Sequence, residues 1–184
     1  MYSFAYVKPR SLSEVAAFLK SNPEARPIAG GMTLIPTLKA RLAQPSHLVD
    51  ISGLEELRGI ELQGATLSIG AGTRHNDVLR SEQVRSAIPA LAELAGRIGD
   101  PAVRNLGTIG GSVANNDPAA DYPAAVLALG AKIITDKREI AADDYFQGLF
   151  TTALDAGEIS CASRFRFPSA PLMRSSRTRH RVTR

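Results

Sequence analysis

Two pairs of adjacent glycines, each flanked by Ser or Thr, constrain the fold of this chain more than any other feature. They are Gly30-Gly31 and Gly110-Gly111. Glycine adopts positive φ without steric cost and lets a ligand lie directly on the backbone, where amide N–H groups point at it. One such pair alone would indicate an ordinary tight turn. Two of them, in segments of low charge, predict turns that bind an anionic group such as a pyrophosphate.

The first pair belongs to a segment with α/β character. Residues 26–29 predict a strand that runs into the glycines, and Thr33 can cap a following helix with Pro36 in its first turn. Residues 47–51 predict another strand, so the order strand, turn, helix, strand favours parallel pairing. We expect one buried stripe on this helix, formed by Leu34, Ile35, Leu38 and Leu42.

Another helix precedes this segment. Ser11 and Glu14 match the capping box, in which each side chain satisfies a backbone amide at the start of a helix. Apolar residues then recur on one face until Asn22 and Pro23 stop the pattern. The sequence therefore predicts a helix that begins directly after Ser11.

The chain changes character near Ser52-Gly53, where we place a boundary between two subdomains. Alternating apolar residues on both sides of Gly64 predict an antiparallel hairpin, and Asp121 can cap a later helix. The expected strands cover 57–63, 66–71, 132–135, 139–142 and 159–167, and the expected helices cover 74–80, 89–98 and, after the Asp121 cap, 122–129. These elements predict a second, mostly antiparallel sheet with helices.

The stretch around the second glycine pair, RNLGTIGGSVANNDPAAD over residues 104–121, also carries two aspartates. Asp117 and Asp121 could accept hydrogen bonds from the ribose or ribityl hydroxyls of a nucleotide ligand. A general acid/base pair is a weaker hypothesis, because the spacing across a proline gives no shared face and no His or Lys is near in sequence. A purely structural role stays open too, with Asp117 starting a turn and Asp121 capping a helix.

Other chemistries lack their characteristic residues. Gly70 and Gly72 match the start of a dinucleotide fingerprint, but His75 stands where the third glycine belongs, so we reject a Rossmann site. The chain contains no P-loop, GxSxG elbow or HExxH pair, which argues against an NTPase, a serine hydrolase and a metalloprotease. Cys161 is the single cysteine and the three histidines share no ligand spacing, so we expect no protein-bound metal.

The positive charge is concentrated at one end of the chain. Residues 169–184 hold five arginines and no acid, so the net charge of +4 falls to 4 − 5 = −1 for residues 1–168. We favour a solvated, disordered tail over one that binds nucleic acid, because the tail lacks aromatic residues. The N-terminus has no apolar signal region and no run is long enough for a membrane span, so we expect a cytoplasmic protein.

Residues 27–36 and 104–121 together resemble the FAD-binding medium subunit of the molybdenum hydroxylases, the family of carbon monoxide dehydrogenase and xanthine dehydrogenase. Residues 6–14, 47–51 and 144–154 support the resemblance, which extends in order over about residues 1–160. It implies the PCMH-type FAD-binding fold of the α+β class. A small α/β subdomain (1–52) and a larger α+β subdomain (53–168) would hold FAD in the cleft between them.

The resemblance also implies which residues bind FAD. The first segment would wrap the pyrophosphate and nearby flavin atoms, the second would complete the cradle, and Asp121 would hold ribityl or ribose hydroxyls. The residues implied are Ile28, Ala29, Gly30, Gly31, Met32, Thr33, Leu34, Ile98, Thr108, Gly110, Gly111, Ser112, Ala114, Asp117 and Asp121. No catalytic side chain and no metal ligand is expected, because the cofactor performs the redox chemistry.

By resemblance, the chain is an electron relay. Substrate would be oxidised at a molybdenum cofactor on a large subunit, and electrons would pass through [2Fe–2S] clusters on a small subunit to FAD and then to an external acceptor. The C-terminus departs from the family, because the arginine tail (169–184) stands in place of a further domain and Ser160 replaces an apolar residue. A frameshifted or truncated reading frame is our hypothesis for the tail. The alternatives are a non-catalytic remnant with a nucleic-acid-binding tail and a stand-alone PCMH-type flavoenzyme.

Overall fold

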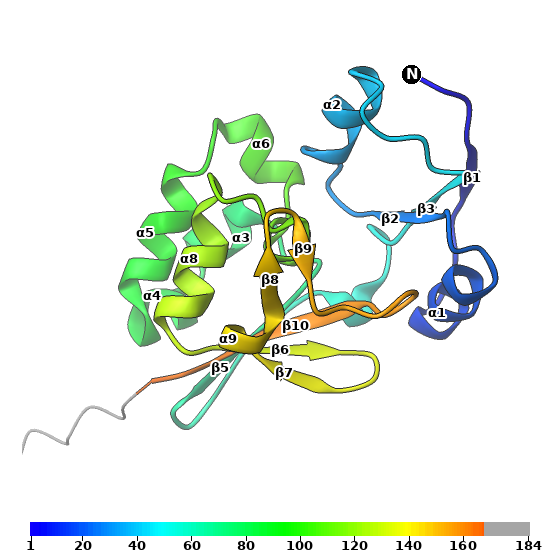
Figure 1. Ribbon diagram of the computed structural model, residues 1–184. Coiled ribbons are helices and arrows are strands. Elements are labelled where there is room, and N and C mark those ends of the chain that lie inside the picture. The colour runs from blue at the N-terminus through cyan, green and yellow to red at the C-terminus, as the bar shows by residue number, and fades with distance from the viewer. Residues whose placement is uncertain (168–184) are drawn as a thin grey trace, which may run out of the picture.

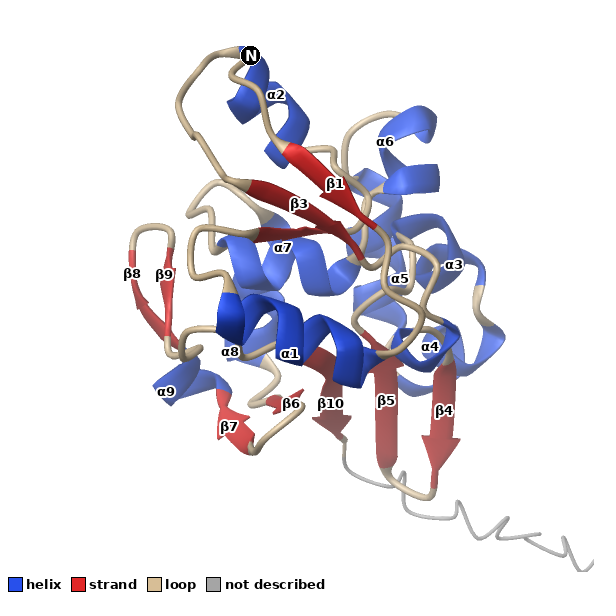
Figure 2. Cartoon of the chain, turned by 90° about the vertical axis from the view of Figure 1, so that its right-hand side faces the viewer, coloured by secondary structure: helices blue, strands red, loops and turns tan. Residues whose placement is uncertain are grey.

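The computed structural model describes residues 1–167, so the predicted basic tail lies outside the described residues. The N-terminal part forms a three-stranded sheet of order β1-β3-β2, in which β3 pairs in parallel with both neighbours (Figures 1 and 2). The predicted parallel pairing is therefore confirmed, although sequence reasoning missed the first strand. The strands are β1 (Ala5–Val7), β2 (Arg26–Ile28) and β3 (His47–Asp50), and the helices between them are α1 (Leu12–Ser21) and α2 (Leu34–Lys39).

Helix α1 begins at the predicted capping box. The Ser11 hydroxyl accepts a hydrogen bond from the Glu14 amide at 3.2 Å. The Glu14 carboxylate in turn accepts from the amide of Arg10 at 2.7 Å, one residue before the cap itself. Val15 and Leu19 are buried on the inner face of the helix. The predicted helix, its start and its apolar face are thus confirmed.

Helix α2 is shorter and more exposed than its sequence predicts. It ends at Lys39, and Arg41 then turns the chain with a positive φ of 60°. Leu42 lies beyond this turn and is 79% exposed, and Ile35 is exposed as well. Only Leu38 of the predicted stripe is buried, so the expectation of a continuous buried face was wrong.

The larger sheet has five antiparallel strands in the order β4-β5-β10-β6-β7. All five strands were expected from the sequence, but their order was not. The last strand in sequence, β10, occupies the centre and pairs with both β5 and β6. The strands are β4 (Ile60–Gln63), β5 (Thr66–Gly70), β6 (Lys132–Thr135), β7 (Glu139–Ala141) and β10 (Ser160–Arg166).

A layer of helices covers one face of this sheet (Figure 1). Leu67, Ile69, Ile133 and Phe165 on the sheet are completely buried against these helices and form the main core. The helices are α3 (His75–Arg80), α4 (Glu82–Ala87), α5 (Pro89–Arg97), α6 (Pro101–Leu106), α7 (Ile109–Asn115) and α8 (Asp121–Ala128). A short 3-10 turn η1 (Glu55–Leu57), helix α9 (Ala142–Tyr145) and the hairpin β8 (Phe146–Gly148) and β9 (Thr151–Thr152) complete the chain.

A second, smaller core joins the two sheets. Val15 and Leu19 of α1 and Val49 of β3 pack in one cluster with Leu57 and with Ile159, which directly precedes β10. The N-terminal sheet is therefore held against the larger one by apolar contacts. The subdomain boundary near Ser52 stays a prediction.

Two sequence expectations about the segment 104–121 need correction. The second glycine pair does not form a turn, because Gly110 and Gly111 lie in the first turn of helix α7. Asp121 does not cap α8 either. Ala120 takes the capping position with an extended backbone, and Asp121 is the first residue inside the helix. The negative charge of a carboxylate at this position is still stabilised by the positive end of the helix dipole.

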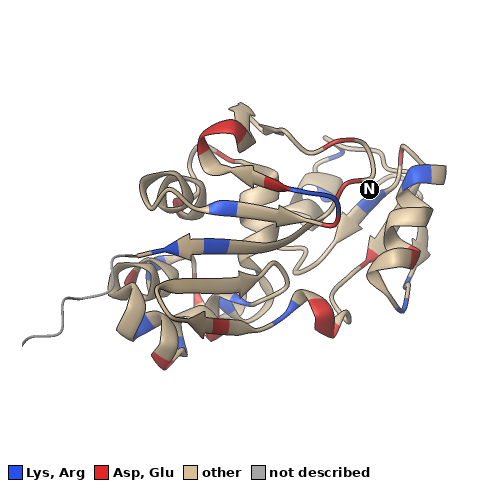
Figure 3. Cartoon of the chain, turned by 90° about the horizontal axis from the view of Figure 1, so that it is seen from below, with Lys and Arg blue, Asp and Glu red and all other residues tan. Residues whose placement is uncertain are grey.

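Charged residues are distributed over the whole described part of the molecule. Lys and Arg are interspersed with Asp and Glu along both sheets and the helices (Figure 3). Within residues 1–167, no helix has the length and apolar character needed to cross a bilayer.

Candidate functional site

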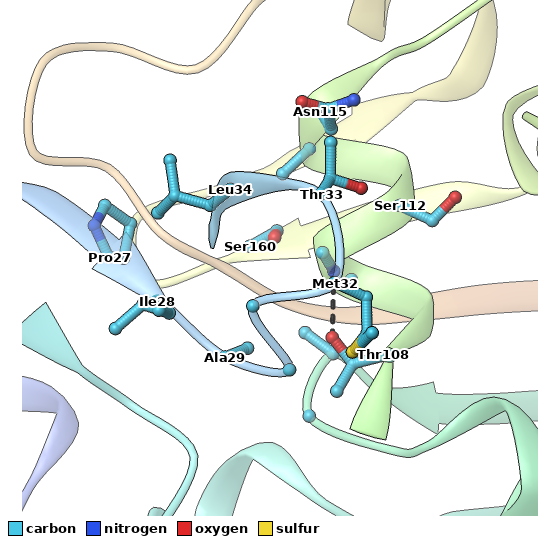
Figure 4. Close-up of a pocket in the computed structure, with 18 of the residues that line it drawn as sticks. Pro27, Ile28, Ala29, Met32, Thr33, Leu34, Thr108, Ser112, Asn115 and Ser160 are labelled. Atoms are coloured by element: carbon cyan, nitrogen blue, oxygen red, sulfur yellow. Dashed lines mark hydrogen bonds between the residues drawn. The ribbon is translucent and has the colours of Figure 1, made fainter. Parts of the chain in front are cut away.

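A cavity of about 450 Å³ lies where the first glycine loop faces helix α7 (Figure 4). This volume falls within the range of roughly 300–1,000 Å³ that is typical of small-molecule and cofactor sites. The cavity brings together most of the residues that the sequence implied: Ile28, Ala29, Gly30, Gly31, Met32, Thr33, Leu34, Ile98, Thr108, Gly110, Gly111, Ser112 and Ala114. The two glycine segments, distant in sequence, thus form opposite sides of one site.

Close backbone approach explains the first glycine pair. A β-carbon on Gly30 would lie 2.0 Å from the carbonyl oxygen of Leu106, which leaves no space for any side chain. Gly31 has a φ of +69°, a conformation that other residues adopt only with strain. The loop therefore lies directly on the connection between α6 and α7.

In the second pair, glycine is required for a different steric reason. A β-carbon on Gly110 would lie 2.4 Å from the β-carbon of Ala71, so glycine lets α7 pack against the chain that follows β5. Thr108 caps the helix, and its hydroxyl accepts from the amide of Gly111 at 3.1 Å. Ala71, Gly72 and His75 also line the cavity. The segment that failed the Rossmann fingerprint is thus part of the site, a role that sequence reasoning missed.

The hydrogen-bond donors of the two segments differ. The amides of Ile109 and Gly110 donate to the carbonyls of Thr73 at 3.1 Å and Ala71 at 2.9 Å, so the start of α7 has already used these donors. In contrast, the backbone amides of residues 29–34 donate to no acceptor within residues 1–167. Successive unpaired backbone amides in a glycine-containing loop are the kind of donors that bind phosphate groups.

The remaining lining is largely apolar. Ile28 and Leu34 flank the glycine loop, and Ile98 and Leu154 come from later segments of the chain. Figure 4 shows Ile28 and Leu34 beside the loop and Thr108 and Ser112 along α7. The cavity therefore combines backbone donors, hydroxyl groups and apolar surface, as required by a ligand with both a phosphate and a ring system.

His75 is a buried member of the lining that the sequence did not identify as functional. It is 5% exposed, and its ring lies 5.3 Å from that of Tyr122. Burial lowers the pKa of His75 to about 4, so the imidazole is neutral at pH 7. Its Nδ1 atom has no hydrogen-bond partner in the part of the chain that the structure describes.

Glu158 is the second unforeseen residue of the lining. Its side chain is 0% exposed, and Arg138 donates to both carboxylate oxygens at 3.0 and 2.9 Å. The Thr135 hydroxyl at 2.7 Å and the Asp155 amide at 2.8 Å complete its partners. The hydrogen bonds from Arg138 are the main reason that the pKa of Glu158 is lowered to about 2. A lone Glu in a sequence carries no signal of such a network.

The two aspartates lie outside the lining of the cavity. The Asp117 carboxylate accepts from the amide of Ala119 at 2.9 Å and closes a turn. Asp121 is exposed at the start of α8, directly after Ala120, which does line the cavity. A cofactor role for either aspartate stays a prediction.

The fold and this cavity define an α+β domain that binds a cofactor. Residues 2–169 match the family described as FAD binding domain in molybdopterin dehydrogenase, and the chain therefore belongs to that family. FAD is the cofactor of this family, which agrees with the expectation from the two glycine segments.

Individual relatives support the same assignment. The chain is 43% identical over 160 residues to the glyceraldehyde dehydrogenase medium chain of Sulfolobus acidocaldarius, covering 85% of this chain and 57% of the relative. It is 42% identical over 161 residues to the carbon monoxide dehydrogenase medium chain of Hydrogenophaga pseudoflava, covering 85% and 56%. A solved structure of carbon monoxide dehydrogenase from the same organism, which lacks the Mo-pyranopterin moiety of the molybdenum cofactor, matches with a TM-score of 0.89 at 41% identity, covering 92% of this chain and 61% of that chain. The chain thus spans less than two thirds of the length of these relatives.

Proposed function

We propose that this chain binds FAD in the cavity between the first glycine loop and α7. The observation that carries this proposal is the row of backbone amides at residues 29–34 without acceptors in the described chain. These donors lie on a loop that packs closely against its neighbours, because a β-carbon on Gly30 would meet the Leu106 carbonyl oxygen at 2.0 Å and one on Gly31 would meet the Ile35 side chain at 2.7 Å. The loop therefore offers the hydrogen-bond donors that the pyrophosphate of FAD requires.

The other lining residues fit the remaining parts of the cofactor. Ile28, Leu34 and Ile98 offer apolar surface for a ring system and keep water away from it. Thr108 and Ser112 carry hydroxyls on the opposite side of the cavity. When bound, FAD supplies the redox chemistry, and the chain holds and shields it.

We further propose that the chain is the FAD-binding electron-transfer subunit of a molybdenum hydroxylase. Its partners would be a large subunit with the molybdenum cofactor and a small subunit with [2Fe–2S] clusters, and FAD would pass electrons to an external acceptor. The designation of the relatives as medium chains supports this arrangement, because it implies a larger and a smaller companion. A cytoplasmic location is part of the same proposal.

Titration of the purified chain with FAD tests the binding proposal. We expect purified protein to be yellow, or to quench the fluorescence of added FAD with saturation at one equivalent. Colourless protein that takes up no added FAD would contradict it. Co-purification with the products of neighbouring genes, followed by a flavin and metal count, tests the subunit proposal separately.

A further inference from the structure

A second, smaller cavity adjoins the larger one at the first glycine loop. It has a volume of about 140 Å³ and shares Ala29, Gly30, Gly72 and Thr108 with the larger cavity. The other residues that line it are Ser52, Arg58, Arg74 and Leu106. Two arginines and no acidic residue thus border a small space next to the backbone donors of the loop.

Backbone hydrogen bonds join the two segments that carry these arginines. The Thr73 hydroxyl accepts from the amide of Gly59 at 3.2 Å and donates to the Gly59 carbonyl at 3.1 Å. The Gly72 amide donates to the carbonyl of Leu57 at 2.6 Å. The residues adjacent to Arg58 and Arg74 are therefore tied to each other, which places both arginines at the border of one cavity. Positive charges at this border attract an anion.

Arg74 is also held against the second glycine segment. Its backbone forms an isolated antiparallel bridge with Thr108, and the next amide, of His75, donates to the carbonyl of Gly107 at 3.0 Å. The Arg74 side chain makes no ion pair, helix-capping bond or other hydrogen bond within residues 1–167. The backbone is therefore fixed while the guanidinium keeps all of its donors.

Arg58 has some of its donors engaged. It forms an ion pair with Glu55 at 3.0 Å and donates to the carbonyl of Ser52. Glu55 is mostly exposed, so this pair neutralises the guanidinium only weakly. Arg58 can therefore add to the positive potential of the cavity, whereas Arg74 has the donors to contact a ligand directly.

The larger cavity lacks a comparable positive charge for a pyrophosphate. Its charged lining residues are Arg26 and Glu158, and Glu158 is already paired with Arg138. Backbone amides bind phosphate oxygens but carry no net charge. Arg58 and Arg74 line the smaller cavity, which shares Ala29 and Gly30 of the glycine loop with the larger one.

We propose that Arg74, supported by Arg58, forms a phosphate subsite that binds a phosphate of the FAD held in the larger cavity. The guanidinium of Arg74 donates to phosphate oxygens where the two cavities adjoin, and the amides of residues 29–34 donate from the glycine loop. This inference rests on the proposed binding of FAD and adds the residues that recognise its negative charge.

The test is the affinity of the full chain for FAD, measured by quenching of flavin fluorescence at low and at high KCl. We expect Arg74→Ala to weaken FAD binding about tenfold at low salt, the loss of one charge-assisted hydrogen bond. Because salt screens exposed charges, the affinity of this variant should depend less on KCl than that of the wild type. Arg74→Lys should keep the salt dependence and lose less affinity.

Arg80→Ala is the matched control, because Arg80 is at the opposite end of the same helix α3 and lines neither cavity. It should bind FAD as the wild type does. Equal affinity of Arg74→Ala and wild type at low salt would overturn the subsite, as would an equal loss in the Arg80→Ala control. Wild-type protein that binds no FAD would instead overturn the proposed function itself. Far-UV circular dichroism and the thermal midpoint establish that each variant is folded.

Discussion

The α-carbon of Gly30 faces the carbonyl oxygen of Leu106 so closely that a β-carbon would lie 2.0 Å from that oxygen. This contact fixes the distance between the first glycine loop and the start of α7, and hence the width of the cavity. Both sides of the contact are backbone, so neither side can move aside as a flexible side chain could.

Gly30→Ala should therefore separate the two sides of the site. We expect it to destabilise the fold by about 1–3 kcal/mol, as overpacking does, and to abolish measurable FAD binding. Chemical unfolding and FAD titration measure the two effects. Gly53→Ala is the control, since a β-carbon there meets only the Lys8 side chain at 3.4 Å. Wild-type stability and affinity in Gly30→Ala would show that the loop does not need this contact.

Thr108→Val removes the hydroxyl that caps α7 while keeping the shape of the side chain. The Gly111 amide then loses its acceptor, so we expect a loss of about 1 kcal/mol in the free energy of unfolding. Thr108→Ser retains the hydroxyl and should stay close to wild type in urea unfolding. If the Val and Ser variants are equally stable, the cap makes no contribution.

Glu158 should make stability depend on pH in the acidic range. Its pKa is lowered from the ordinary 4.5 to about 2, so its contribution is complete above 4.5 and is lost as the pH falls toward 2. Glu158→Gln should cost about 2 kcal/mol at pH 7, the value of a charged hydrogen bond. The variant should also show a flatter stability profile between those two pH values. An unchanged profile would argue against the ion pair with Arg138.

His75 should make the free energy of unfolding depend on pH in a different range. Burial lowers its pKa from 6.5 to about 4, so between these values the unfolded chain takes up a proton that the folded chain does not. Stability from this residue is therefore present above pH 6.5 and decreases as the pH falls toward 4. His75→Gln should remove that part of the slope in urea midpoints measured across the range, while Glu158→Gln should leave it in place. Retention of the slope in His75→Gln would assign it to another group.

Local patterns predicted much of the fold. The capping box at Ser11 and the alternating residues around Gly64 each specify an element through neighbours in sequence, and α1 and the β4–β5 hairpin follow them. Helix α7 was missed because a first turn with two glycines has a low intrinsic helix propensity. Its packing against Ala71 outweighs that propensity, and such a contact is not visible in sequence.

The residues of the candidate site were likewise predicted from the sequence only in part. Both glycine pairs were recognisable because glycine is the residue that permits close backbone approach. His75 and Glu158 were not, because what distinguishes them is burial and partners brought by other segments. The buried stripe on α2 failed for a related reason: a six-residue helix is too short to carry the stripe as far as Leu42.

The central place of β10 has a consequence for the order of folding during synthesis. Strands β5 and β6 are both made earlier, yet each pairs with β10, so one edge of each stays open until residues 160–166 leave the ribosome. Open strand edges are sites of intermolecular pairing, so the nascent chain is exposed to aggregation during this interval. Ile159 and Ser160 line the larger cavity, so this cavity is completed at the same moment as the sheet. A chain released before residue 160 would lack both.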